Sequence, residues 1–157
     1  MKKTAIFVDV QNVYYTTKQA YQRQFNYRQF WNNLSQENDI VIANAYAIAR
    51  DDDGQHRFQT ALRSIGFEVK LKPFIQRHDG SAKGDWDVGI TIDVLDAASD
   101  VDKVVLLSGD GDFSLLLDRV SEKHNVETHV YGVPQLTARS LIQSCDVYSE
   151  ISEDSLL

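Results

Sequence analysis

Several features that mark other protein classes are scarce in this sequence. Its 157 residues include one cysteine, Cys145, and two prolines, whereas 43% of the residues are hydrophobic. A chain of this length and apolar content can bury a core without disulfide or metal crosslinks. The composition therefore excludes a disulfide scaffold, a collagen-like fibre and a disordered chain. We expect one domain over residues 1–157.

Long hydrophobic runs are also missing. Two lysines and a short apolar stretch at the start resemble the beginning of a signal peptide, but Asp9, Gln11 and Asn12 interrupt the stretch. No stretch approaches the length of a membrane span. With a single cysteine and no export signal, we expect a cytoplasmic protein without a membrane partner.

Positive charge is in deficit, because 16 basic residues face 23 acidic ones and the net charge is -7. Such a balance ordinarily argues against a nucleic-acid partner, since Lys and Arg drive phosphate binding. The acidic excess is not uniform, however: residues 84–122 hold ten acidic residues and two basic ones. Solvated helix faces account for several of these acids, but they account poorly for Asp110 and Asp112, which follow a strongly apolar segment.

Short apolar runs alternate with helical patterns along the chain. Helical spacing relates Phe113 to Leu117 and Val120, and residues 86–98 are apolar on two faces, which predicts a helix buried between neighbours. The alternation predicts a three-layer α/β/α fold, Rossmann-like, around a mostly parallel sheet, for which we consider the order 3-2-1-4-5. The predicted strands cover residues 4–10, 40–48, 67–75, 103–107 and 127–131.

Polar side chains follow two of these strands where each one ends. Asp9 ends the first strand, with Asn12 at the turn into a helix, and Asp110 and Asp112 follow the fourth strand. In an open parallel sheet, ligands bind beyond the carboxyl ends of the strands at the point where the strand order reverses. Asp87 falls in the first turn of the helix predicted over residues 86–98, where the helix dipole favours a carboxylate. We expect these residues to share one crevice.

Several carboxylates in one crevice repel each other unless a cation lies between them. A site without His or Cys favours Mg²⁺ or Mn²⁺ over zinc, and such an ion can activate water and neutralise a phosphate. Each residue also has a purely structural interpretation. Asp112 could cap the following helix, Asp110 could brace the glycine turn, and Asn12 could serve as a cap. Asp93 shares a helix face with Asp96 and Asp100, which is typical of a solvated stripe.

Some basic and aromatic residues are candidates for contacts to phosphates and unpaired bases, although most of the basic residues in this part of the chain are typical of a solvated surface. Lys83 is the best candidate for a contact to substrate phosphate, followed by Arg50 and Arg77. A cluster of aromatic residues after the first strand either belongs to the core or stacks on unpaired bases. This cluster comprises Tyr14, Tyr15, Tyr21, Phe25, Tyr27 and Trp31.

Three blocks of sequence carry a resemblance that covers nearly the whole chain. Residues 7–12 read FVDVQN, residues 83–88 read KGDWDV, and residues 108–113 read SGDGDF. In this order and at these separations they resemble the NYN domain, and the LabA-like bacterial group in particular. The resemblance implies a PIN-like fold with sheet order 3-2-1-4-5, and its characterised relatives include metal-dependent ribonucleases.

The resemblance also implies roles for particular residues. Asn12 matches a supporting polar group in the catalytic set, Asp93 matches a further acid in the same helix as Asp87, and the pair Lys83 and Gly84 matches a basic element beside the site. The catalytic acids and metal ligands implied by the motifs are Asp9, Asp87, Asp110 and Asp112.

The leading hypothesis is a hydrolase, a Mg²⁺- or Mn²⁺-dependent ribonuclease acting on single-stranded or structured RNA. The resemblance implies in-line attack by water and products with a 5′-phosphate and a 3′-hydroxyl. The alternative is a non-catalytic RNA- or nucleotide-binding regulatory module of the same fold, because the family includes members with regulatory roles only. A phosphatase of the haloacid-dehalogenase type ranks low because Gln11 stands where its second Asp is needed. As partners we expect RNA, and a homodimer stays open.

Overall fold

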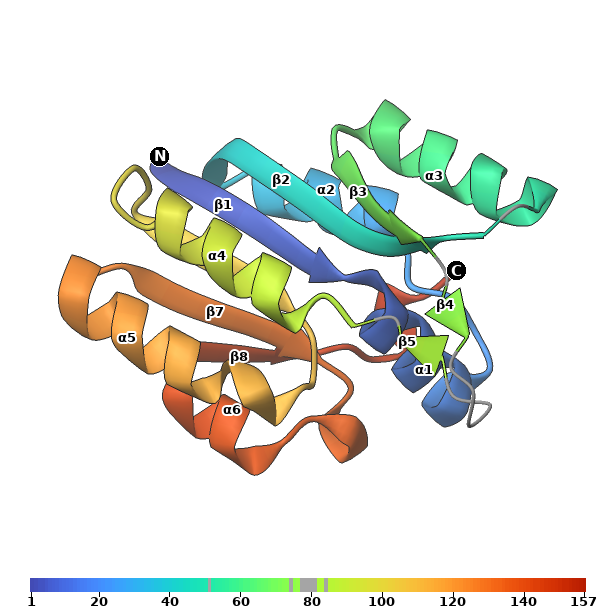
Figure 1. The fold of residues 1–157 in the computed structure, drawn as a ribbon. Helices are drawn as coiled ribbons and strands as arrows, with labels where there is room; N and C mark the ends of the chain where they lie inside the picture. Colours follow the sequence, from blue (N-terminus) through green and yellow to red (C-terminus); the bar gives the residue numbers. More distant parts are fainter. Residues whose placement is uncertain (51, 74, 77–81, 84) are drawn as a thin grey trace.

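The protein is described by a computed structural model that covers residues 1–50, 52–73, 75–76, 82–83 and 85–157 (Figure 1). Its main sheet has six strands in the order β3-β2-β1-β6-β7-β8, and every neighbouring pair is parallel. Two short segments, β4 (Ile75–Gln76) and β5 (Ala82–Lys83), pair antiparallel outside this sheet. The strands of the main sheet are β1 (Lys2–Asp9), β2 (Asn38–Ala49), β3 (Glu68–Pro73), β6 (Lys103–Leu107), β7 (Glu127–Gly132) and β8 (Val147–Glu150).

The sheet confirms the predicted architecture and adds one strand. The first five strands along the main sheet follow the order 3-2-1-4-5, and β8 extends the sheet as an edge beside β7. The four residues of β8 are half-buried or exposed, so they lack the apolar run by which the interior strands were predicted. Such an edge strand has no clear pattern in the sequence, and only its pairing with β7 in the structure identifies it.

Helices cover both faces of the sheet and divide the core into two parts. One part lies between the sheet and α4, α5 and α6, and the other lies between the sheet and α1, α2 and α3. The three-layer α/β/α fold is therefore confirmed. The helices are α1 (Val10–Tyr21), α2 (Tyr27–Ser35), α3 (Asp53–Ile65), α4 (Asp87–Ala97), α5 (Ser114–His124) and α6 (Arg139–Ser144).

Strand β1 lies at the centre of the sheet and contributes to both parts of the core. Ala5 and Phe7 pack in the part with α4, whereas Ile6 and Val8 pack in the part with α1. All four side chains are fully buried. Because side chains alternate along a strand, Asp9 shares its face with Phe7. The period of the strand thus directs the terminal carboxylate toward the layer that contains α4.

Helix α4 differs from its prediction. Ile90 and Val94 are buried against the sheet, but Val88, Ile92 and Leu95 are 70%, 53% and 39% exposed. The prediction that this helix lies buried between neighbours is therefore wrong. A helix in the outer layer of a three-layer fold presents only one stripe to the sheet, however apolar its other face is. Across the described part of the chain, no helix has the length and apolar character to cross a membrane.

Candidate metal centre

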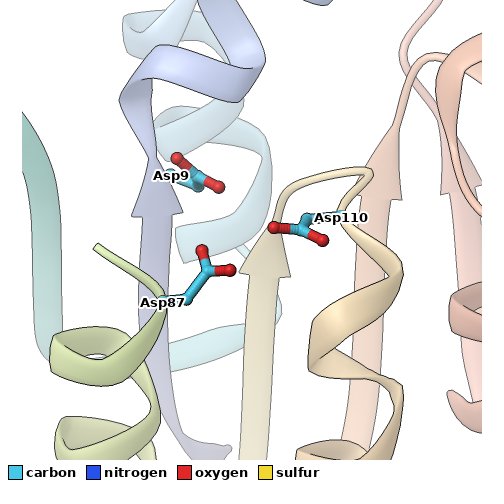
Figure 2. Close-up of side chains that lie close together, drawn as sticks. All are labelled: Asp9, Asp87 and Asp110. Carbon is cyan, nitrogen blue, oxygen red and sulfur yellow. The ribbon is translucent and has the colours of Figure 1, made fainter. Parts of the chain in front are cut away.

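Three carboxylates from distant parts of the chain meet at the carboxyl edge of the sheet. One oxygen each from Asp9, Asp87 and Asp110 lies within 4.8 Å of the others. Figure 2 shows the three side chains directed toward a shared space, from the end of β1, the start of α4 and the turn after β6. The strand-order reversal between β2, β1 and β6 is what brings these segments together.

Asp9 is held by two hydrogen bonds in addition to its place on the strand. Its Oδ1 accepts a bond from the backbone N–H of Asn12 at 3.4 Å, and its Oδ2 accepts one from the Ser108 hydroxyl at 3.0 Å. The Asn12 side-chain oxygen accepts from the backbone N–H of Gly109 at 2.8 Å. Asn12 therefore ties the start of α1 to the turn after β6, which fits the supporting role expected of it.

The turn that carries Asp110 is fixed by its own hydrogen bonds and by a glycine. The Asp110 backbone N–H donates to the Ser108 hydroxyl at 3.1 Å, and Asp110 Oδ1 accepts from the Asp112 N–H at 2.9 Å. A Cβ atom at Gly109 would lie 2.5 Å from the carbonyl oxygen of Leu136. Only glycine permits this close approach, so Gly109 is required for the path of the turn that carries Asp110.

Asp87 is positioned by the residue that precedes it. The Trp86 indole N–H donates to the Ala47 carbonyl at 2.8 Å and ties the start of α4 to β2, while Lys72 lies over the indole ring at 4.6 Å. Trp86 is the N-cap residue, and Asp85 Oδ1 accepts from the Asp87 N–H at 3.3 Å. The first-turn position predicted for Asp87 is thus observed.

The surroundings of the cluster disfavour charge on two of its members. Burial raises the pKa of Asp9 to about 6, although the hydrogen bonds from Ser108 and Asn12 oppose the rise and the charge of Asp110 adds to it. Burial also raises the pKa of Asp87 to about 7, together with a hydrogen bond and charge repulsion from Asp110. At neutral pH Asp87 is therefore partly protonated, and a divalent cation would displace this proton.

Two other predicted acids lie outside this group. Asp112 is exposed, and its backbone N–H rather than its carboxylate contacts Asp110. Asp93 accepts hydrogen bonds from the Tyr46 hydroxyl at 2.7 Å and from Lys70 Nζ at 2.8 Å. Burial acts to raise the pKa of Asp93, but these two bonds outweigh it and the pKa is lowered. Asp93 is therefore an ion-pair partner rather than part of a solvated stripe.

Some of the predicted phosphate contacts cannot be placed. Lys83 belongs to β5, but its side chain lies outside the described residues, as do Arg77 and Gly84. Arg50 follows β2, is exposed, and lines a cavity described below.

Ser108 is the residue of the site to which sequence reasoning assigned no role. Its buried hydroxyl donates to Asp9 and accepts from the Asp110 N–H, so one side chain bridges two of the three acids. Its signal in the sequence is weak: it is the first polar residue after the apolar segment that forms β6. Serine is common in turns for other reasons, and only the neighbouring strand end shows what it contacts.

A comparison with known families matches the NYN domain over residues 3–152. The chain belongs to the NYN domain family. NYN proteins form a nuclease-type family with a PIN-like fold, and the carboxylate cluster that could hold a divalent cation is present in this member.

Two relatives extend this finding. This NYN protein is similar to the low amplitude and bright protein LabA of Synechococcus elongatus, with 30% identity over 96% of this chain and 84% of that protein. It is also similar to a crystal structure of a Vibrio parahaemolyticus protein of unknown function. That comparison gives a TM-score of 0.94 and 56% identity, covering 99% of this chain and 96% of the other. The first agrees with the predicted LabA-like group, and the second agrees with the predicted fold.

Proposed function

We propose that this NYN protein is a metal-dependent ribonuclease that hydrolyses RNA phosphodiester bonds with Mg²⁺ or Mn²⁺ held by Asp9, Asp87 and Asp110. The observation that carries the proposal is the approach of three carboxylate oxygens to within 4.8 Å of one another. The raised pKa values of Asp9 and Asp87 support it, because a cation in the cluster would favour the ionised carboxylates that burial and mutual repulsion disfavour.

The donor set fits a hard divalent cation. The described residues of the cluster supply carboxylate oxygens and neither imidazole nor thiolate. Mg²⁺ and Mn²⁺ prefer a few carboxylates together with water and phosphate oxygens, whereas zinc favours nitrogen and sulfur. A bound cation of this kind would lower the pKa of a coordinated water and offset the charge of the scissile phosphate.

The residues around the cluster have supporting roles in this proposal. Ser108 and Asn12 hold the Asp9 carboxylate and the turn after β6 at a constant separation. Asp112 is exposed beside Asp110 and would orient water on the solvent side. Lys83 precedes Asp87 by four residues and would contact the substrate phosphate. We assign Asp93 to the positioning of α4 rather than to the metal.

The test is cleavage of a labelled single-stranded RNA by purified protein with Mn²⁺. The wild type is expected to cleave, and the variants Asp9→Asn and Asp110→Asn to lose activity by about a hundredfold or more. Asp118→Asn, a change of an exposed acid on α5, is the matched control and should retain activity. Equal cleavage by all three variants would assign the activity to a contaminant and overturn the proposal. Mn²⁺-dependent RNA binding without cleavage would instead favour the non-catalytic binding module.

A further inference from the structure

A cavity of about 370 Å³ lies close to the candidate metal centre, between α1, α3 and the end of β2. Val10 and Gln11, which directly follow Asp9, form part of its wall. Ile48 from β2 and Phe58 from α3 contribute apolar surface. The volume falls within the usual range for small-ligand sites, so it accommodates a nucleobase.

The aromatic residues after β1 divide into two groups in the structure. Phe25 and Tyr27 are buried in the core part with α1, as the core interpretation predicted. Tyr14 and Tyr15 are 43% and 52% exposed, and both line the cavity. Their rings lie edge to face with centroids 5.3 Å apart. Two aromatic rings on one turn of α1 thus line the cavity and are also exposed to solvent.

A buried hydroxyl lies in the same wall. Tyr27 lines the cavity and is only 8% exposed. Burial raises the pKa of Tyr27, and the charge of Asp9 raises it further. The Tyr27 hydroxyl therefore stays protonated at neutral pH and offers a hydrogen-bond donor on the cavity wall.

Basic and amide groups lie around the cavity, whose lining also includes the acidic Asp52. Lys18 Nζ lies 5.5 Å from the centroid of the Tyr14 ring, and Arg50 lines the cavity. Gln11 and Gln55 line it as well, and their side-chain amides offer both donors and acceptors. Accessible aromatic rings beside basic side chains are the combination by which proteins hold single-stranded nucleic acid, where the rings stack on bases and the cations contact phosphates.

We propose that this cavity binds an unpaired nucleobase of an RNA strand that continues to the candidate metal centre, with the base stacked on Tyr14 or Tyr15. The proposal rests on the proposed function for its choice of ligand, because the carboxylate cluster is the place where the strand would be cut. Binding in the cavity is nevertheless measurable when no cleavage occurs. The site selects single-stranded RNA, since a base inside a duplex cannot enter it.

The experiment measures the dissociation constant of a fluorescein-labelled single-stranded RNA by anisotropy, in the Asp110→Asn background so that the RNA stays intact. Replacing both Tyr14 and Tyr15 by Ala is expected to raise the dissociation constant about tenfold or more. Replacing both by Phe keeps the rings and should leave it nearly unchanged. Leu115→Ala, a change of an exposed residue on α5, is the control for a general surface effect.

An RNA of the same length without bases separates stacking from phosphate contacts. The double Ala variant should bind this abasic RNA as well as its parent does, because no base remains to stack. An Ala variant that binds ordinary RNA as tightly as its parent would overturn the proposal, provided that thermal unfolding shows both to be folded. So would an equal loss of affinity for ordinary and abasic RNA.

These outcomes are distinct from those that test the ribonuclease. If the wild type does not cleave RNA but its RNA affinity depends on the two tyrosine rings, the proposed activity is contradicted and the proposed base-binding role of the cavity is supported. If the wild type cleaves RNA, and if replacing both tyrosines by Ala changes neither the Michaelis constant nor the dissociation constant, the proposed activity is supported and the proposed base-binding role of the cavity is contradicted.

Discussion

Ser108 illustrates how much of this site depends on a single side chain. Its hydroxyl donates a hydrogen bond to Asp9 and accepts one from the backbone N–H of Asp110, so one side chain supports both acids. The bond to Asp9 lowers a pKa that burial otherwise raises. A residue that contacts no cation thereby influences how readily the cluster ionises, and outer contacts of this kind commonly alter metal affinity.

At the residue scale, we predict that Ser108→Ala weakens Mn²⁺ binding about tenfold at neutral pH, since Asp9 loses the bond that favours its charged form. The free energy of unfolding should also fall by about 1 kcal/mol, because the Asp110 N–H loses its acceptor. Isothermal titration calorimetry and denaturant unfolding measure the two effects. Ser64→Ala removes a hydroxyl that bonds within α3 and should leave Mn²⁺ affinity unchanged. An unaltered affinity in Ser108→Ala would contradict the assigned role.

At the scale of elements, two of the acids on α4, Asp87 and Asp93, have opposite effects on stability. Asp87 begins the helix and faces the other carboxylates, whereas Asp93 binds Tyr46 of β2 and Lys70 of β3. The two positions are six residues apart and therefore lie on different sides of a helix with 3.6 residues per turn. One side of α4 therefore contributes Asp87 to the site, and the other side binds the sheet through Asp93.

This division predicts different results for two substitutions on the same helix. Asp93→Ala should lower the free energy of unfolding by about 1 to 2 kcal/mol, because the Tyr46 hydroxyl and the Lys70 ammonium lose their partner. Its Mn²⁺ affinity should stay within about threefold of the wild type. Asp87→Asn should instead abolish tight Mn²⁺ binding and leave the metal-free protein at least as stable, since repulsion is removed. Strong loss of Mn²⁺ binding in Asp93→Ala at unchanged stability would place Asp93 in the site after all.

At the scale of the whole molecule, stability depends on pH through groups whose pKa values are shifted in opposite directions. Asp9 and Asp87 have raised pKa values of about 6 and about 7, so the folded state binds more protons than the unfolded state between about pH 4 and about pH 7. Their contribution to stability is lost as the pH rises through this range. Burial lowers the pKa of His129 to about 4, so its contribution is lost as the pH falls below about 6.5.

We therefore predict that Mn²⁺ raises the melting temperature more at about pH 8 than at about pH 5, because protons compete with the cation for the carboxylates. Differential scanning fluorimetry with and without Mn²⁺ measures this difference. The Asp9→Asn, Asp87→Asn double variant should lose the Mn²⁺ effect at both pH values and should be more stable than the metal-free wild type at about pH 8. Comparing variants at one pH cancels the contribution of His129. A pH-independent effect of Mn²⁺ that the double variant retains would exclude the cluster as its site.

Asp110 and Asp112 show which part of the site could not be predicted from the sequence alone. Both were expected at the metal because both follow an apolar strand. Only one of these two acids joins the cluster. The short 3₁₀ turn Gly111–Phe113 and the packing of Gly109 against Leu136 decide which one it is. Leu136 is distant in the sequence, so no local pattern contains this information.

The sequence by itself determined the alternation of strands and helices, the family, and the strand ends at which Asp9 and Asp110 stand, because burial periodicity and turn chemistry are local. The tertiary structure decided which acids meet, that Asp93 binds Lys70, that one apolar face of α4 stays exposed, and that Tyr14 and Tyr15 border a cavity. Each of these depends on contacts between segments far apart in the chain. Such contacts arise only once the crossovers of a parallel sheet have placed those segments side by side.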